Sequence, residues 1–263
     1  MQVIAGFAAI IAVASHETQA QDRSVDQLFD KPLHKQILPV PANPTEHEKG
    51  TLTCFYYPYL MIKEAYYEDH KGAGMLSITN LRKEKDTPAC QFDRAMDERK
   101  IQDWEGHFLG VKDSYVFFGG SDGDGSGIPF AVYTNNGDRV FSDSGVLHSI
   151  KLTEPVPNRD LEHWYTNPLL LRYRRSFLAP CSLRADDEKA CWNSVRGLTG
   201  LTQTTPPDCG AAYEPYEKVA PSQVNSVRNG PSFIDYDVET ALDDRGVIRV
   251  TPIGSARKCY PAP

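Results

Sequence analysis

Six cysteines constrain the fold of this 263-residue chain more than any other feature of its sequence. Their number is even, and in an exported chain an even set of cysteines predicts a framework of disulfides. A short loop loses less entropy on closure than a long one, so we expect neighbours along the chain to pair. The expected disulfides are Cys54–Cys90, Cys181–Cys191 and Cys209–Cys259.

The N-terminus carries the features of a secretory signal peptide. Val3–Ala14 is an apolar run, and it is followed by Thr18 and Ala20, small residues at the third-last and last positions that signal peptidase accepts. A transmembrane helix needs about 20 apolar residues, and this run is shorter. We therefore expect residues 1–20 to be a signal peptide, the location to be periplasmic or extracellular, and the mature form not to insert into a membrane.

Composition and charge limit the classes of partner. The formal net charge is −7 at pH 7, which provides no general attraction to nucleic acid or to anionic membranes. The chain contains 13 Tyr, 11 Phe, 19 Gly and 19 Pro, a composition typical of strands punctuated by turns. We expect no nucleic-acid partner, whereas a protein partner fits this composition.

The chain divides into a leader and one β-rich domain. Residues 21–50 are polar and rich in proline, which predicts an extended polar arm. Aromatic and branched residues begin at Thr51, so we expect folded structure to start there. The single domain is predicted over 51–263, with a possible subdomain break near 156–210.

The clearest β signal lies in the middle of the chain. Ser114–Phe118, Ile128–Tyr133 and Arg139–Phe141 are apolar runs, and Asn136-Gly137 between the last two is a strong hairpin signal. This pattern predicts a three-stranded antiparallel meander. Further strands are expected at 74–79, 146–152, 169–178, 233–242 and 247–252.

One helix is expected, at Asp186–Gly197, because acidic residues fill its first turn and Gly197 offers a stop. It would carry Cys191 and Trp192 inward, and residues 202–215 would form a connector. The predicted fold class is mainly β, with antiparallel sheets arranged as a sandwich or open barrel and one short disulfide-linked helix.

A Gly/Asp-rich loop resembles the first half of a calcium loop. Its oxygen-bearing residues are Asp122, Asp124 and Ser126. Calcium needs six to eight oxygen ligands, but Tyr133 stands where an EF-hand has its final Glu, and the flanking segments look like strands. A calcium site completed by Asp138 or Asp143 is one hypothesis; a plain Gly/Asp turn is the favoured one. No other cofactor is expected.

Two patterns could indicate a hydrolase. Gly119–Gly123 has the form G-x-S-x-G around Ser121, but a nucleophile elbow leads from a strand into a helix, and a strand follows here. His107, His148 and His163 are candidate general bases, although none stands beside a recognisable nucleophile.

Two charged clusters occur in predicted strands. Asp235, Asp237 and Glu239 alternate with apolar residues, so that all three carboxylates share one face of a strand; a solvated outer face explains them best. Arg172, Arg174 and Arg175 surround Tyr173. These arginines could grip a carboxylate or phosphate, but a solvated face is again favoured.

Two functions remain open from the sequence. The first is a non-enzymatic binding protein, such as an exported inhibitor, an immunity-type protein or an adhesin-like module. The second is a secreted hydrolase that pairs Asp235 or Glu239 with His107 or His163 in the fold. Binding is favoured, because the sequence shows export and disulfides but no assembled set of catalytic residues.

Overall fold

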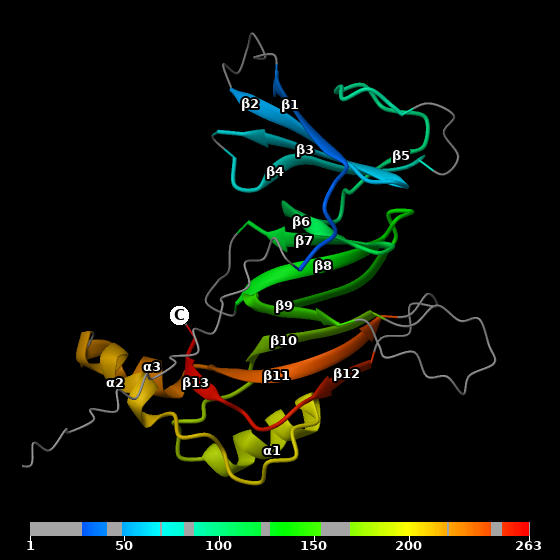
Figure 1. Ribbon diagram of the computed structural model, residues 1–263. Helices are drawn as coiled ribbons and strands as arrows, with labels where there is room; N and C mark the ends of the chain where they lie inside the picture. Colours follow the sequence, from blue (N-terminus) through cyan, green and yellow to red (C-terminus); the bar gives the residue numbers. More distant parts are fainter. Residues whose placement is uncertain are drawn as a thin grey trace, which may run out of the picture.

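A computed structural model of the protein describes residues 28–40, 49–68, 70–81, 87–121, 127–153, 169–219, 221–242 and 249–262. In this part of the chain the strands form one five-stranded and one eight-stranded sheet, and every strand pair is antiparallel. The five-stranded sheet stacks on one end of the eight-stranded sheet, and helices lie at the other end of the molecule (Figure 1). The expected β-rich, sandwich-like fold is confirmed.

The five-stranded sheet has the order β1-β2-β3-β4-β5. Its strands are β1 (His34–Val40), β2 (Gly50–Tyr56), β3 (Leu60–Tyr67), β4 (Ala73–Asn80) and β5 (Glu98–Lys100). Folded structure therefore begins before Thr51, because β1 pairs with β2 along its whole length. Pro39 lies in this outermost strand, where a residue without an N–H is tolerated. β1 corrects the prediction of an extended arm up to residue 50.

The eight-stranded sheet has the order β12-β11-β10-β9-β8-β7-β6, and β13 also pairs with β11. Its strands are β6 (Gly106–Lys112), β7 (Tyr115–Gly120), β8 (Ile128–Thr134), β9 (Arg139–Thr153), β10 (Leu169–Leu178), β11 (Ser232–Leu242), β12 (Arg249–Pro252) and β13 (Lys258–Pro261). The predicted meander is confirmed as β7, β8 and β9. Its last turn uses Gly137 at φ 79°, a conformation that glycine adopts without steric cost.

Helix α1 (Glu188–Thr199) confirms the predicted helix, and it buries Cys191 and Trp192 as expected. The helix ends at Gly200 and not at Gly197, because Gly200 takes the left-handed conformation with φ 75° and its N–H bonds the carbonyl of Arg196. A glycine in that conformation satisfies a carbonyl that the helix end leaves open.

The sequence predicts one helix, and the structure contains two more in the described residues. α2 (Gly210–Val219) and α3 (Val224–Asn229) are joined by a 3-10 turn at Pro221–Gln223. α2 begins in the segment predicted as a connector, and Pro215 lies inside it. None of the helices in the described residues is long and apolar enough to cross a membrane.

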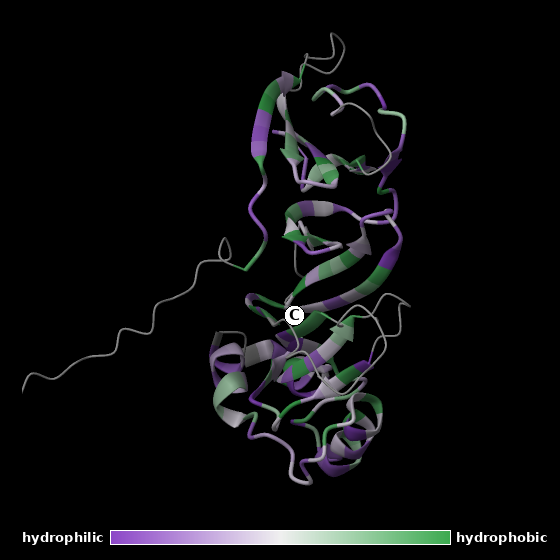
Figure 2. Cartoon of the chain, turned by 45° about the vertical axis from the view of Figure 1, so that its right-hand side comes forward, coloured by the Kyte–Doolittle hydropathy of each residue, from purple (hydrophilic) through white to green (hydrophobic). Residues whose placement is uncertain are grey.

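Three apolar clusters support the sheets. The junction core lies between the two sheets and joins side chains of β3 and β4 to those of β6, β7 and β8. The helix core lies between the eight-stranded sheet and α1, and the outer core covers the far face of the five-stranded sheet. Hydrophobic and hydrophilic bands alternate along several strands in Figure 2, as expected for strands that place successive side chains on opposite faces.

All six cysteines lie in the described residues, and they pair as expected: Cys54–Cys90, Cys181–Cys191 and Cys209–Cys259. The first bond ties β2 to the segment before β5, the second ties the residues after β10 to α1, and the third ties the start of α2 to β13. Disulfides persist in oxidising compartments, so these bonds indicate a protein of an oxidising environment.

Candidate functional site

The segment that precedes β5, residues 87–97, is attached firmly to the five-stranded sheet. Cys90 is bonded to Cys54 of β2. The ammonium group of Lys63 in β3 donates to the carbonyl oxygens of Gln91 and Asp93 at 3.0 and 3.1 Å. The same ammonium group forms an ion pair with Glu98 Oε2 at 2.6 Å. We call residues 87–97 the stapled segment.

The Lys63–Glu98 ion pair is fully buried, since the two side chains are 1% and 0% exposed. An isolated buried ammonium group is very costly, and here two carbonyls and a carboxylate satisfy it. Glu98 Oε2 also accepts a hydrogen bond from the N–H of Ala95 at 2.8 Å. The bonds of this pair fix the path of the stapled segment against β3 and β5.

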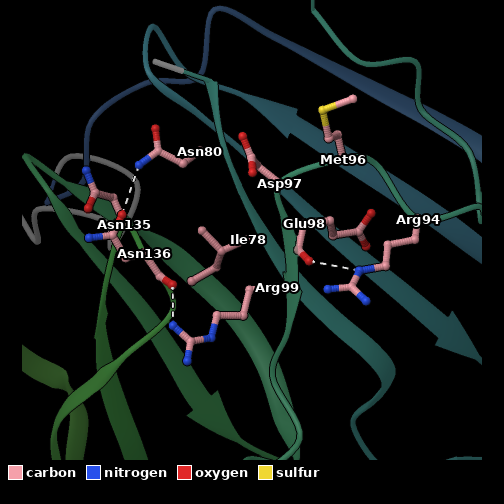
Figure 3. A pocket seen from close by; sticks show the side chains of 9 residues that line it. All are labelled: Ile78, Asn80, Arg94, Met96, Asp97, Glu98, Arg99, Asn135 and Asn136. Atoms are coloured by element: carbon pink, nitrogen blue, oxygen red, sulfur yellow. Dashed lines mark hydrogen bonds between the residues drawn. The ribbon is translucent and has the colours of Figure 1, made fainter. Parts of the chain in front are cut away.

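A polar pocket of about 300 Å³ lies where the two sheets meet, and Figure 3 shows the side chains around it. The Asn80 amide donates to Asn136 Oδ1 at 3.0 Å. Arg99 donates to the Asn136 carbonyl at 3.1 Å and to Asp138 Oδ1 at 2.8 Å. The hairpin between β8 and β9 is thereby held against β4 and β5. The lining residues are Ile78, Asn80, Arg94, Met96, Asp97, Glu98, Arg99, Asn135 and Asn136.

Two more hollows adjoin this pocket. The second, of about 480 Å³, shares Arg94 and Arg99 with the first. The third, of about 510 Å³, shares Lys100 and Gln102 with the second and continues to Trp104. We call the three hollows together the β5 groove, because each of them is lined by residues of β5.

Cationic side chains in the walls of the β5 groove provide hydrogen-bond donors. The Nε of Arg94 donates to the Glu98 carbonyl at 3.1 Å, and within the described residues its terminal nitrogens have no hydrogen-bond partner. The guanidinium groups of Arg94 and Arg99 and the ammonium group of Lys100 suit carboxylate and carbonyl oxygens. No cluster of His, Cys, Asp or Glu in the described ranges is arranged to hold a metal ion.

Comparisons with known proteins identify no relative. No protein-family model, curated protein or solved structure matches the chain. The functional argument therefore rests on the residues themselves.

The predicted calcium residues Asp122, Asp124 and Ser126 lie outside the described residues, so the calcium site stays a prediction. Of its two candidate partners, Asp138 pairs with Arg99 and Asp143 pairs with Arg175. Ser121 directly follows β7, and the next strand in the chain, β8, is the antiparallel neighbour of β7. The next element described after Ser121 is thus a strand, whereas a nucleophile elbow leads into a helix.

The predicted pairing of His107 with Asp235 or Glu239 is wrong. His107 lies on β6, whereas both acids lie on β11, and β7, β8, β9 and β10 separate these strands. Five steps of about 4.8 Å between neighbouring strands place β6 and β11 roughly 24 Å apart within the sheet. His107 Nδ1 instead lies 3.5 Å from Glu64 Oε1 of the other sheet. His148 is an exposed residue of β9, and His163 lies outside the described residues.

The predicted alternation of acidic and apolar residues along β11 is confirmed, because Ile234, Tyr236 and Val238 are buried. The acidic face, however, is not freely solvated. Asp235 is only 6% exposed, and it accepts hydrogen bonds from Ser176 Oγ at 2.6 Å and from the Tyr260 hydroxyl at 3.1 Å.

The other two acids of β11 are paired with arginines of the same face. Glu239 bonds Arg172 at 2.6 Å, and Asp237 contacts both Arg174, at 3.6 Å, and Arg257. The register places Arg172 opposite Glu239 and Arg174 opposite Asp237, so these two arginines share a face of the sheet. These charges support the sheet and do not converge on a pocket.

Arg175 points to the other face of β10 and joins a polar group in the helix core. Its Nε lies 3.0 Å from Asp143 Oδ1, and the Tyr173 hydroxyl donates to the same carboxylate. Burial and the Asp143 charge raise the pKa of Tyr173 above its ordinary value, because both disfavour the tyrosinate.

The residues of the β5 groove carry no motif that sequence analysis recognises. Arg94, Arg99 and Lys100 form no motif along the chain, and Asn80 of β4 is far in sequence from Asn136, which lies in the turn between β8 and β9. One signal was available: a disulfide between Cys54 and Cys90 predicts that the segment around Cys90 is fixed against β2, although it does not predict the groove.

Proposed function

We propose that this chain is an exported, non-enzymatic binding protein of the periplasm or extracellular space, and that the β5 groove is its binding surface. A protein partner fits this surface best, in the manner of an inhibitor, immunity-type protein or adhesin-like module. The proposal rests on one observation above all: three hollows adjoin along β5, the first two through Arg94 and Arg99 and the last two through Lys100 and Gln102.

The walls of the groove are held in place before any partner arrives. The Cys54–Cys90 bond and the buried Lys63–Glu98 pair fix the stapled segment, and Arg99 fixes the β8–β9 hairpin. A surface that is already ordered loses less conformational entropy on binding. This rigidity favours a stapled segment that recognises a partner over one that merely connects β4 to β5.

A capture experiment tests the proposal. Oxidised wild-type protein is immobilised at physiological salt and exposed to periplasmic, culture-supernatant and candidate host extracts. The test variant is Arg94→Glu/Lys100→Glu, which reverses two groove cations. The matched control is Lys189→Glu/Lys218→Glu, which makes the same charge change at exposed residues of α1 and α2, away from the groove.

We expect a stoichiometric partner to bind the wild type and the control but not the groove variant. A sample with reduced disulfides should also lose the partner, because the stapled segment is then released from β2. Equal capture by the groove variant and the control would place binding elsewhere, and the absence of any partner from all extracts would refute the binding function.

A further inference from the structure

The outer edge of β5 offers main-chain groups to a further strand. The N–H of Ile101 donates to the carbonyl of Leu76 at 2.9 Å, and Lys100 stands opposite Ser77 in the register of β4 and β5. In an antiparallel pair, hydrogen-bonded and non-hydrogen-bonded residue pairs alternate. The N–H and C=O of Lys100 therefore point away from β4, toward the free edge of the sheet.

The stapled segment closes this edge at Glu98 but not at Lys100. The N–H of Glu98 donates to the Ala95 carbonyl at 3.3 Å, and its C=O accepts from Arg94 Nε at 3.1 Å. Lys100 is exposed, and within the described residues no group bonds its main-chain N–H or C=O. An unpaired sheet edge of this kind is a template for another strand.

The hollows on the two sides of Lys100 both combine cations with apolar side chains. The second contains Arg94 and Arg99 and lies beside Phe92 of the outer core. The third contains Ile101 and Trp104, which belong to the junction core. Lys71 and Lys100 also line the third hollow, and Lys100 lines the second as well, so the edge at Lys100 runs between two hollows with cationic walls.

We propose that the partner presents an extended peptide segment that adds a strand to the five-stranded sheet at Lys100; this inference rests on the proposed function of the groove. Successive side chains of a strand point to opposite faces. Acidic side chains of the peptide meet the cations of the groove, Arg94 in the second hollow and Lys100 in the walls of the second and the third. Main-chain hydrogen bonds supply affinity, and the two hollows supply specificity.

The test uses a displayed library of linear peptides, selected on immobilised, oxidised wild-type protein. Enriched peptides are then measured against two variants of one residue. Lys100→Pro removes the outward N–H, and proline is tolerated on an edge strand when its nitrogen faces away from the neighbouring strand. Lys100→Ala is the matched control, which removes the side chain but keeps the N–H. Thermal melts establish that both variants are folded.

We expect enriched peptides to carry acidic residues, because cations line both hollows. Lys100→Pro should weaken their binding about tenfold relative to Lys100→Ala, as the loss of a hydrogen bond worth about 1.4 kcal/mol requires. Equal binding by the two variants would overturn strand addition while leaving the groove as a binding surface. Equal binding by Arg94→Glu/Lys100→Glu as well would overturn the proposed function, and a selection that enriches no peptide would overturn the peptide partner.

Discussion

At the scale of single residues, Tyr173 links stability to alkaline pH. Its hydroxyl donates to Asp143 inside the helix core, and burial and that charge raise its pKa above the ordinary value of 10.0. Below pH 10 both folded and unfolded states keep the proton, so the stabilising contribution of the group is complete. Above pH 10 only the unfolded state releases it, and the free energy of unfolding falls by about 1.4 kcal/mol per pH unit for each such tyrosine.

Tyr173→Phe removes one of these tyrosines, so the free energy of unfolding should fall less steeply above pH 10. Tyr57 and Tyr133, whose pKa values are also raised, still contribute to the decline. Denaturant unfolding at several pH values between 9 and 12 measures the slope. An unchanged slope in Tyr173→Phe would show that Tyr173 titrates alike in the folded and unfolded states.

The Lys63–Glu98 pair should be the most sensitive ionic contact of the groove. Lys63→Met leaves the Glu98 carboxylate buried without its counterion, and breaking a buried pair in this way costs about 3–5 kcal/mol of unfolding free energy. The double variant Lys63→Met/Glu98→Leu should recover at least half of that loss, because no charge is then left buried. Denaturant unfolding at pH 7 measures both.

The matched control for this pair is Lys218→Ala. Lys218 pairs with Glu214 on the surface of α2, and the two side chains are 71% and 62% exposed. Water screens such a pair, so its loss should cost at most about 0.5 kcal/mol. A cost for Lys63→Met as small as for Lys218→Ala would mean that the Lys63–Glu98 pair does not stabilise the fold.

At the scale of elements, two glycines should respond in opposite directions to alanine. Gly197 lies within α1, and a Cβ there would meet no atom within 4 Å, so Gly197→Ala should stabilise the protein by about 0.5–1 kcal/mol. Gly200 has φ 75°, and Gly200→Ala should destabilise it by about 1 kcal/mol. Thermal or denaturant unfolding measures both. The opposite order would mean that the helix stops at Gly197, as its sequence suggests.

Elements with strong local signals could be predicted from the sequence, whereas those set by tertiary contacts could not. Asn136-Gly137 specifies its hairpin locally, and the acidic first turn marks α1. α2 contains Pro215, which argues against a helix, but it is placed by the buried Tyr213 and by the disulfide of Cys209. The outermost strand β1 likewise depends on its partner, β2.

The β5 groove could not be predicted for the same reason. Asn80, Arg94, Arg99 and Asn136 come together only through the pairing of β4 with β5 and the packing of the two sheets. Local pattern does not specify contacts over such separations along the chain. The disulfide pairs could be predicted because chain entropy favours neighbours, and this argument needs no knowledge of the fold.

At the scale of the whole molecule, the junction core should make the two sheets unfold together. Phe118 of β7 is fully buried, and its ring contacts Phe108 and Tyr133 with centroids 6.1 and 5.4 Å apart. The same cluster contains Ile62 of β3 and Ile78 of β4 in the other sheet. Each sheet thus buries apolar surface against the other. On the side where they meet, the two sheets share one core, and neither has a core of its own there.

Phe118→Ala should therefore lower the stability of both sheets by about 3–5 kcal/mol, the usual cost of emptying a buried phenylalanine site. Native-state hydrogen exchange measures this at Ile62 in one sheet and at Ala131 in the other. Cooperative unfolding predicts equal losses at the two amides, because both exchange through the same global opening. A large loss at one amide alone would instead show that the sheets are separate folding units. The first hollow, which both sheets line, would then form only when the two units dock, and partner binding would stabilise that docking.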